Sequence, residues 1–246
     1  MRLFRAHGLG NDYLLVEDGP PMTAELVRAL CHRHTGVGSD GVLEPGHGTL
    51  RIWNPDGSEA EKSGNGLRIW AWWAARRGAI SPMAVETKGG RVVCHVQGER
   101  VRVEMGVARI GVEAVLAGTP CRRVDLGNPH AVVEGIPHDW RQLGPAIEAS
   151  VPGRTNVQFC VTTGPNRVEA RIWERGAGET MSSGSSACAI AASSVFAGHV
   201  VSPVSVDMPG GTAVVHVGDD FRVMLDAPVE PIGVIEVDGA WLIRRS

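Results

Sequence analysis

Two serine–glycine pairs, Ser63-Gly64 and Ser183-Gly184, carry the residue types best placed to do chemistry in this sequence. Each pair follows a glycine-rich polar loop and opens a segment of helical character. A helix N-terminus presents unpaired backbone N–H groups and about half a positive charge, which suits a carboxylate. The two serines are therefore interpreted either as helix N-caps or as groups that act on a bound carboxylate substrate.

The elements that position these serines are repeated along the chain. The offset that relates Ser63 to Ser183 also relates Arg51-Ile52-Trp53 to Arg171-Ile172-Trp173, and Glu59 to Glu179. A repeat of this length predicts two domains of one fold, related by a pseudo-twofold axis. We place them at residues 1–110 and 111–237. Two helix N-termini would then converge on one cleft and reach opposite faces of a small molecule.

The local pattern predicts an α+β fold. Helices are expected over residues 24–34, 65–77 and 185–197, and the last two are apolar on most sides. Segments rich in β-branched residues and bounded by glycine predict short strands through residues 80–135 and again over 213–225. The predicted architecture is a mainly antiparallel β shell around a central buried helix, built twice. A final strand within 238–246 is expected to return to the first domain.

Composition restricts the class of protein. The chain has 246 residues with 43% hydrophobic and 21% charged residues, as in globular proteins. A net charge of −3 gives no electrostatic reason to expect nucleic acid or an anionic membrane as partner. The start of the sequence lacks the apolar run of a signal peptide, and the low-charge stretch 187–197 is too short to span a bilayer. A cytoplasmic location is expected.

Metal and cofactor signals are weak. The five cysteines are odd in number and form no Cys-x-x-Cys, so buried free thiols are expected. His32 and His34 form the one close histidine pair, without a carboxylate or cysteine to complete a metal site. No Gly-x-Gly-x-x-Gly follows a strand, so no dinucleotide site is indicated. We expect neither a metal nor a cofactor.

Several motifs stand in order along nearly the whole chain. They are His7-Gly8-Leu9-Gly10-Asn11-Asp12-Tyr13, Arg33-His34-Thr35-Gly36-Val37-Gly38, Asn54-Pro55-Asp56-Gly57-Ser58-Glu59, Gly64-Asn65-Gly66, Gly127-Asn128-Pro129-His130, Thr155-Asn156-Val157, Glu174-Arg175-Gly176-Ala177-Gly178-Glu179-Thr180 and Met208-Pro209-Gly210-Gly211. Together they resemble the motifs of the diaminopimelate epimerase family.

The resemblance implies a cofactor-independent amino-acid epimerase. Such an enzyme interconverts LL- and meso-2,6-diaminopimelate by two-base proton transfer at the α-carbon, in the synthesis of lysine and peptidoglycan precursors. In the family, two cysteines face the α-carbon from opposite sides, and helix N-termini stabilise the charge that develops on the carboxylate. The resemblance also suggests a homodimer.

The family's substrate contacts carry over to a defined set of positions. The predicted substrate-binding residues are Asn11, Asn54, Gly64, Asn65, Asn128, His130, Asn156, Glu174, Arg175, Gly184 and Ser185. Glu174 and Arg175 suit the ammonium and carboxylate of an amino-acid head group. One contact departs from the pattern, because this chain has Gly41 where some members have glutamine.

The catalytic positions depart from the family as well. The two family cysteines align with Ser63 and Ser183, while Cys188 lies five residues further into the second helix than Ser183. A thiol has a pKa of about 8.5, and an alcohol is weaker as an acid by several units. A serine therefore needs a neighbouring base to act. Candidates for that base are His7, Asp56, His130 and Glu174.

Four functions remain compatible with these residues. The first, which we predict, is a diaminopimelate epimerase or a close amino-acid epimerase that works through Ser63 and Ser183. The second is a related proton-transfer isomerase or lyase with a carboxylate or histidine base. The third is a binding protein that kept the pocket and lost catalysis. The fourth is a Cys-to-Ser variant that traps substrate.

Overall fold

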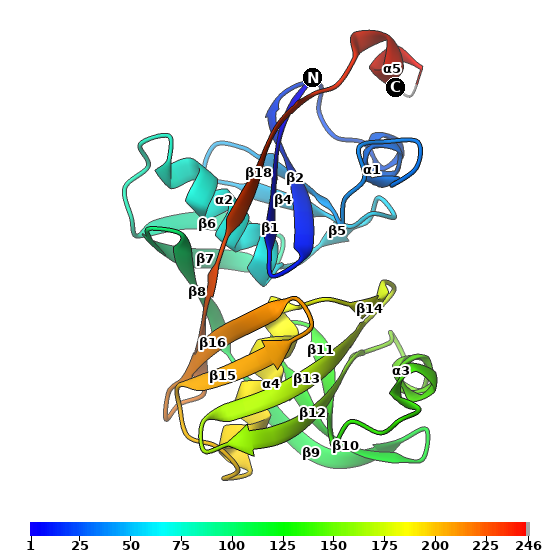
Figure 1. The fold of residues 1–246 in the computed structure, drawn as a ribbon, viewed down its shortest axis with the longest axis vertical. Helices are drawn as coiled ribbons and strands as arrows, with labels where there is room; N and C mark the ends of the chain where they lie inside the picture. The colour runs from blue at the N-terminus through cyan, green and yellow to red at the C-terminus, as the bar shows by residue number, and fades with distance from the viewer. Residues whose placement is uncertain (245–246) are drawn as a thin grey trace. The chain divides into compact units, whose positions relative to one another are not determined.

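The chain forms two compact units in the computed structural model, which describes residues 1–244 (Figure 1). Unit 1 comprises Met1–Val101 together with the chain from Pro228 onward, and unit 2 comprises Arg102–Ala227. Strands predominate in both, and each unit contains one long buried helix. The predicted α+β fold is confirmed.

Unit 1 contains a six-stranded sheet in the order β18-β1-β2-β3-β4-β5. Its strands are β1 Arg2–Gly8, β2 Asn11–Asp18, β3 Val42–Pro45, β4 Leu50–Trp53, β5 Glu59–Ala60 and β18 Glu230–Glu236. Helix α1, Ala24–Cys31, begins at Thr23, whose hydroxyl accepts the Leu26 N–H at 3.2 Å. Its apolar face packs on Leu3, Leu14 and Val42 of the sheet, which fixes one end of the loop that leads to β3.

Helix α2, Gly64–Ala75, is the buried helix of unit 1 (Figure 1). It packs against β1, β2, β3 and β7. Leu67, Ile69 and Ala71 are fully buried, as the apolar sequence predicts. The antiparallel strands β6 Met83–Thr87 and β7 Gly90–Gln97 follow it, and β8 Arg100–Val107 begins in unit 1 and ends in unit 2.

Unit 2 arranges its strands around helix α4, Gly184–Phe196 (Figure 1). Its strands follow the order β8-β17-β16-β15-β13-β12-β11-β10-β9 in a sheet that also includes β6 and β7 next to β8, and β14 pairs with β13. The strands are β9 Arg109–Leu116, β10 Thr119–Asp125, β11 Pro129–Glu134, β12 Asn156–Gly164, β13 Arg167–Glu174, β14 Gly178–Thr180, β15 Val204–Met208, β16 Gly211–Val217 and β17 Arg222–Pro228. Residues 187–192 of α4 are fully buried, and its small side chains let strands approach from several directions.

The sequence repeat corresponds to a structural repeat. The order β4-β5-α2-β6-β7-β8 in the first copy recurs as β13-β14-α4-β15-β16-β17 in the second. In both copies a strand and a short antiparallel partner precede the serine, and the helix begins at the glycine that follows it. The repeat therefore places Ser63 and Ser183 at equivalent points of the two units.

Two predictions of secondary structure need correction. The expected strand within 238–246 is instead helix α5, Gly239–Ile243, because Asp238 caps it by accepting the Trp241 N–H at 3.0 Å. Residues 245 and 246 of that prediction lie outside the described residues. The strand that returns to unit 1 is β18, which pairs antiparallel with β1. Helix α3, Trp140–Ala149, was not predicted from the sequence.

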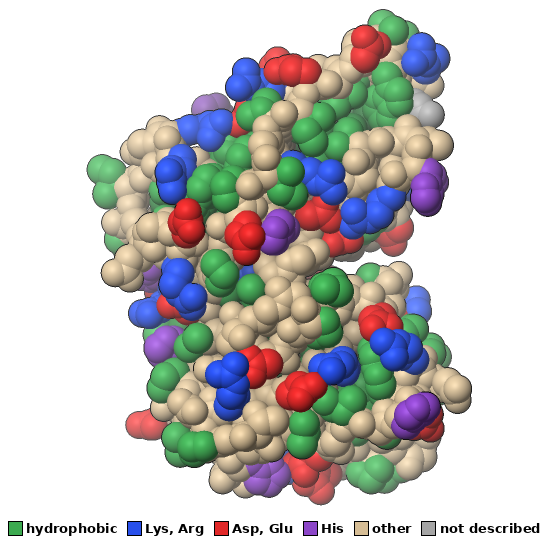
Figure 2. Space-filling model, in the orientation of Figure 1, with side chains coloured by type: hydrophobic (Ala, Val, Ile, Leu, Met, Phe, Trp, Pro, Cys, Tyr) green, Lys and Arg blue, Asp and Glu red, His purple; other side chains and the backbone are tan. Residues whose placement is uncertain are grey.

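The surface carries both signs of charge. On the face shown in Figure 2, Lys and Arg side chains are interspersed with Asp and Glu over both units. Within residues 1–244, no helix has the length and apolar content needed to cross a bilayer.

Candidate active site

Ser63 is the N-cap of helix α2. Its backbone is extended, with φ −138° and ψ 117°, and its Oγ accepts the Gly66 N–H at 3.1 Å. The capping interpretation is therefore correct for this serine. The same Oγ accepts a second hydrogen bond, from the Tyr13 hydroxyl at 2.9 Å. Two donors thus converge on the oxygen that the sequence marks as a candidate for catalysis.

Asn54, another predicted substrate-binding residue, lies in the turn between β4 and β5, which precedes α2 in the sequence. The Asn54 N–H donates to the Ser58 carbonyl at 2.8 Å, and Asn54 Nδ2 donates to Ser58 Oγ at 3.0 Å. Asp56 accepts from both the Ser58 hydroxyl and the Ser58 N–H, and these hydrogen bonds lower the pKa of its carboxyl. Asp56 is therefore committed to the turn, which counts against it as the base for Ser63.

A chain of amides links the start of α2 to strand β2. Asn65 Nδ2 donates to Asn11 Oδ1 at 2.9 Å, and Asn11 Nδ2 donates to Asp40 Oδ2 at 3.0 Å. On the other side of Asn65, the buried Arg68 donates to its Oδ1 at 2.7 Å. The structure therefore brings two predicted substrate-binding residues, Asn11 and Asn65, into direct contact and fixes the orientation of both amides.

Asp12 directly follows Asn11 in the sequence, and its carboxylate accepts hydrogen bonds from two arginines. Arg5 and Arg33 donate to its carboxylate at 2.5 Å and 2.8 Å, and Arg33 also donates to Asp40 at 2.7 Å. Burial alone would raise the pKa of Asp12, but the hydrogen bonds and charges of Arg33 and Arg5 outweigh it and hold the pKa below its usual value. Burial raises the pKa of the neighbouring Asp40.

We expect the free energy of unfolding to fall in acid through Asp12. A carboxyl whose pKa is depressed in the folded state stabilises the fold above its unfolded pKa, and this contribution is lost as the pH falls through the lower folded value. Asp40 has the opposite sign and offsets part of the loss. Asp12→Asn should cost about 2 kcal/mol at neutral pH and flatten the acid dependence.

Urea unfolding of wild type and Asp12→Asn at neutral and acidic pH measures this contribution. The exposed Asp18→Asn serves as the control and should leave both values unchanged. An acid dependence that is equally steep in Asp12→Asn would contradict the assignment.

Ser183 occupies the equivalent N-cap of helix α4 in unit 2. Its backbone is again extended, with φ −143° and ψ 125°, and it is 4% exposed. Unlike Ser63, Ser183 makes no side-chain cap hydrogen bond to the described residues of its helix. Two residues after Ser183, the Oγ of Ser185 accepts from Asn128 Nδ2 at 3.5 Å. The predicted contacts Asn128 and Ser185 therefore lie together at the start of α4.

His130 is buried next to the same helix. Its Nε2 lies 3.0 Å from Asn128 Oδ1, and its Nδ1 lies 3.0 Å from Gln158 Nε2. Gln158 also donates to Ser186 Oγ at 3.0 Å. Burial, with a smaller contribution from the charge of Arg175, lowers the pKa of His130 to about 3, so the ring is neutral at pH 7. His130 thus holds Asn128 in place with both of its ring nitrogens engaged.

Asn156 connects two further predicted segments. Its Nδ2 donates to the Pro129 carbonyl at 3.0 Å, and its Oδ1 accepts the Arg175 N–H at 3.0 Å. Strand β13 ends at Glu174, and the loop that begins at Arg175 is also held by Glu148. This buried carboxylate of α3 accepts the Gly176 N–H at 2.8 Å. Asn128, His130, Asn156 and Arg175 therefore form one connected group in unit 2.

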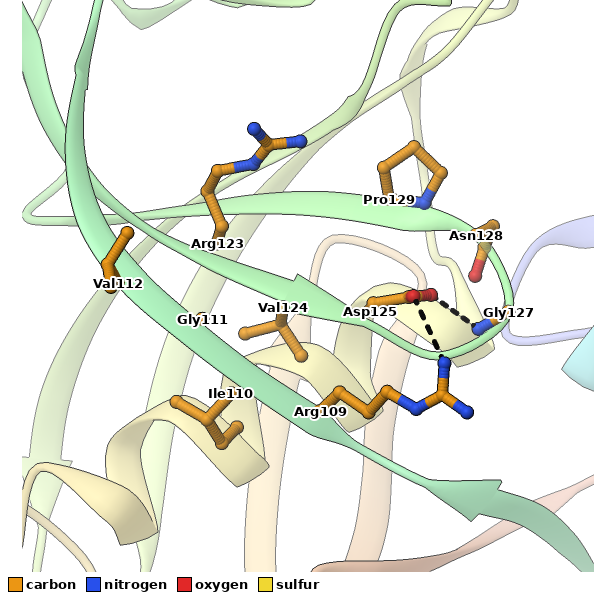
Figure 3. A pocket seen from close by; sticks show the side chains of 10 residues that line it. All are labelled: Arg109, Ile110, Gly111, Val112, Arg123, Val124, Asp125, Gly127, Asn128 and Pro129. Carbon is orange, nitrogen blue, oxygen red and sulfur yellow. Dashed lines mark hydrogen bonds and ion pairs between the residues drawn. The ribbon is translucent and has the colours of Figure 1, made fainter.

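An open groove of about 480 Å³ borders this group (Figure 3). It is lined by Arg109–Val112 of β9, Arg123–Asp125 of β10 and the loop Gly127–Pro129. Asp125 accepts the Gly127 N–H at 2.8 Å and lies 3.9 Å from Arg109 Nη1. Dashed lines mark both interactions in Figure 3. Of the predicted site residues, only Asn128 lines this groove.

The cysteines are buried free thiols, as the sequence predicts. Burial raises the pKa of Cys31 to about 11 and of Cys160 to about 12. Thiols with such values are weak nucleophiles at neutral pH. Neither Cys31 nor Cys160 therefore supplies a thiolate for proton transfer at neutral pH.

Three residues that make hydrogen bonds to the predicted site residues or their loops were missed in the sequence. They are Tyr13, Gln158 and Glu148. Tyr13 offered a signal, because it is the one tyrosine of the chain and directly follows Asn11-Asp12. Gln158 and Glu148 offered none, since a glutamine on a strand and a glutamate on a helix are ordinary surface residues until the fold buries them.

Comparisons with known proteins agree with this arrangement. The family described as diaminopimelate epimerase matches residues 3–111 and 123–230. "Diaminopimelate epimerase 2" of Nostoc sp. is 37% identical over 92% of this chain and 91% of its own length. The diaminopimelate epimerase of Desulfitobacterium hafniense is 35% identical over 93% and 95%.

A solved structure shares the fold. A probable proline racemase from Agrobacterium radiobacter superposes with a TM-score of 0.77 at 16% identity, covering 97% of this chain and 93% of that one. The family match spans both units, and the sequence relatives are similar along almost their full length. The chain therefore belongs to the diaminopimelate epimerase family.

Proposed function

We propose that the protein is a cofactor-independent epimerase that interconverts LL- and meso-2,6-diaminopimelate, a step in the synthesis of lysine and peptidoglycan precursors. One observation carries this proposal. Relatives named as diaminopimelate epimerases match this chain at 34–37% identity over most of both sequences. The duplicated serine at the start of a buried helix supports it, because epimerisation needs one group to remove a proton and another to return one.

In this proposal Ser63 and Ser183 are the two proton-transfer groups. The backbone N–H groups of Gly64-Asn65 and Gly184-Ser185 stabilise the carboxylate as charge develops on it, since a helix N-terminus favours negative charge. Each serine is the N-cap of its helix, directly before those N–H groups. This position supports assigning the same role to both.

The remaining predicted residues bind the rest of the amino acid. They are Asn11, Asn54, Asn128, His130, Asn156, Glu174 and Arg175. The hydrogen bonds from Asn65 to Asn11 and from Arg175 to Asn156 support this assignment, because they fix the amides before substrate arrives. A preorganised site loses less entropy on binding.

We expect Arg175→Ala to weaken binding of diaminopimelate about tenfold or more, through loss of a charge-assisted hydrogen bond. Asn11→Ala should do the same. Calorimetric titration of each variant with diaminopimelate measures the loss. Arg171→Ala, on the strand before Arg175 and paired with Glu169, is the matched control and should bind normally. Unchanged affinity in both Asn11→Ala and Arg175→Ala would contradict the proposed binding site.

Proton NMR of the protein with LL-diaminopimelate in D2O tests the reaction itself. Loss of the α-proton signal with appearance of the meso isomer is the expected result. Binding without exchange would overturn the epimerase and leave a binding protein.

We further propose that the enzyme works in the cytoplasm as a homodimer. Five buried free cysteines suit a reducing compartment. Strand β9 lies at the edge of its sheet and exposes Val112 and Val115, which suits contact with another chain. Light scattering should give twice the mass of the chain.

A further inference from the structure

Tyr13 is the one tyrosine of the chain and is 6% exposed. Its hydroxyl donates to Ser63 Oγ at 2.9 Å, and the Gly66 N–H donates to the same oxygen at 3.1 Å. With both acceptor positions of Ser63 Oγ occupied, the hydroxyl proton of Ser63 is left to be donated elsewhere. Tyr13 therefore controls the direction in which Ser63 can donate.

The fold makes room for this tyrosine at Gly41. A Cβ on Gly41 would lie 2.6 Å from Tyr13 Cε1 and 2.4 Å from the Trp53 carbonyl oxygen, closer than real contacts allow. The Leu14 N–H donates to the Gly41 carbonyl at 3.0 Å, so β2 and this residue are also tied by their backbones. A side chain at position 41 would displace the ring that carries its hydroxyl to Ser63.

The difference in acidity between the Tyr13 and Ser63 hydroxyl groups gives their hydrogen bond a chemical role. An alcohol is a poor base because its anion is unstable, whereas a phenol, with a pKa of about 10, is a stronger acid by several units. When a Tyr13–Ser63 pair loses one proton, the negative charge rests on the phenolate oxygen. Ser63 then stays a neutral hydroxyl that donates to the phenolate, and one lone pair of its oxygen is left to accept a proton.

We propose, resting on the epimerase function proposed above, that Tyr13 is a positioning residue that relays a proton through Ser63. In one direction the substrate C–H bond breaks and an O–H bond forms on Ser63, while the original hydroxyl proton of Ser63 passes to the Tyr13 phenolate. The C–H electron pair stays on the α-carbon and delocalises into the carboxylate. In the other direction the Tyr13 phenol protonates Ser63 as Ser63 gives its own proton to the carbanion.

Of the two serines, Ser63 has the tyrosine contact that the relay needs, and Ser183 does not share it. The repeat that matches Gly10-Asn11 to Gly127-Asn128 places His130 at the position equivalent to Tyr13. Both ring nitrogens of His130 contact Asn128 and Gln158 instead. The two halves of the duplicated site therefore differ in how their serines obtain a proton.

The titration of Tyr13 tests the contact without requiring turnover. Since the chain has a single tyrosine, ultraviolet difference spectroscopy reports this residue alone. Ser63→Ala removes the hydroxyl that would stabilise the phenolate and should raise the titration midpoint by about half a pH unit or more. Ser183→Ala is the matched control and should leave the midpoint unchanged. An unshifted midpoint in Ser63→Ala would overturn the relay.

Kinetics in D2O then separate a relay from a structural role. Tyr13→Phe keeps the ring over Gly41 and should lower kcat for exchange of the α-proton about 100-fold, with KM changed less than about threefold. In a Ser63→Cys background the thiol is acidic enough to act alone, so Tyr13→Phe should cost less than about fivefold.

Each outcome decides a different point. A wild-type rate in Tyr13→Phe overturns the relay and leaves the epimerase standing. An equal loss of rate in the Ser63 and Ser63→Cys backgrounds shows a structural tyrosine and also overturns the relay. A wild-type protein that exchanges no α-proton overturns the proposed function and the relay together.

Discussion

Replacing Ser63 and Ser183 together by cysteine is expected to raise the rate of epimerisation about 100-fold or more. Both residues are N-caps, where the helix dipole stabilises an anion on the side chain. A thiol at such a position has a pKa below about 8.5, so a useful fraction is thiolate at neutral pH. Each pKa unit by which the serine is weaker costs about 1.4 kcal/mol of driving force.

The measurement is the rate of conversion of LL- to meso-diaminopimelate by wild type, each single variant and the double variant. Thiol alkylation provides the control. Wild type should resist iodoacetamide, because its native cysteines are buried, whereas the double variant should be inactivated. If the double variant is no faster than wild type, Ser63 and Ser183 are not the proton-transfer groups.

The second large effect concerns Gly36, in the loop between α1 and β3. A Cβ on Gly36 would lie 1.9 Å from the Ala29 carbonyl oxygen and 2.8 Å from that of Leu30. Both atoms belong to the backbone of α1 and cannot move aside as a flexible side chain would. Gly36→Ala should therefore lower the free energy of unfolding by about 3 kcal/mol or more.

Chemical unfolding of Gly36→Ala measures this loss. Gly239→Ala is the control, since a Cβ there meets no atom within 4 Å and should leave stability nearly unchanged. The same loop carries Arg33 and Asp40, which hold Asp12 and Asn11. Because a shift of this loop would disturb those hydrogen bonds, Gly36→Ala should also lower the activity. A loss below about 1 kcal/mol would show that the loop can shift without strain.

Much of the fold could be predicted because its signals are local. Helices α2 and α4 follow a serine–glycine start with an apolar run, and that pattern needs no tertiary information. The sequence did not predict helix α3 because Gly144 and Pro145 lie inside it, and both residues are poor helix formers. Its stability comes instead from packing of Trp140 and Ile147 on the β12 residue Phe159, which the sequence does not reveal.

The residues of the candidate site also fall into two groups: those that local sequence patterns predict and those that depend on tertiary packing. Ser63 and Ser183 were found because their spacing repeats, and the position of Ser63 as a side-chain cap is local. The contact between Tyr13 and Ser63 spans fifty residues, and so depends on how β2 packs beside α2. The pKa of His130 depends on complete burial, a property of the finished fold. Contacts of this kind come from tertiary structure alone.

The division of the chain between the units sets an order of synthesis. Unit 2 is continuous, whereas unit 1 is built from two segments on either side of unit 2 and needs β18 to pair with β1. On the ribosome, residues 102–227 are complete before β18 has been made. The β18-facing edge of β1 therefore stays unpaired until β18 has been synthesised, and until then it is an accessible template for other strands. Unit 1 can therefore complete its six-stranded sheet only after all of unit 2 has been synthesised.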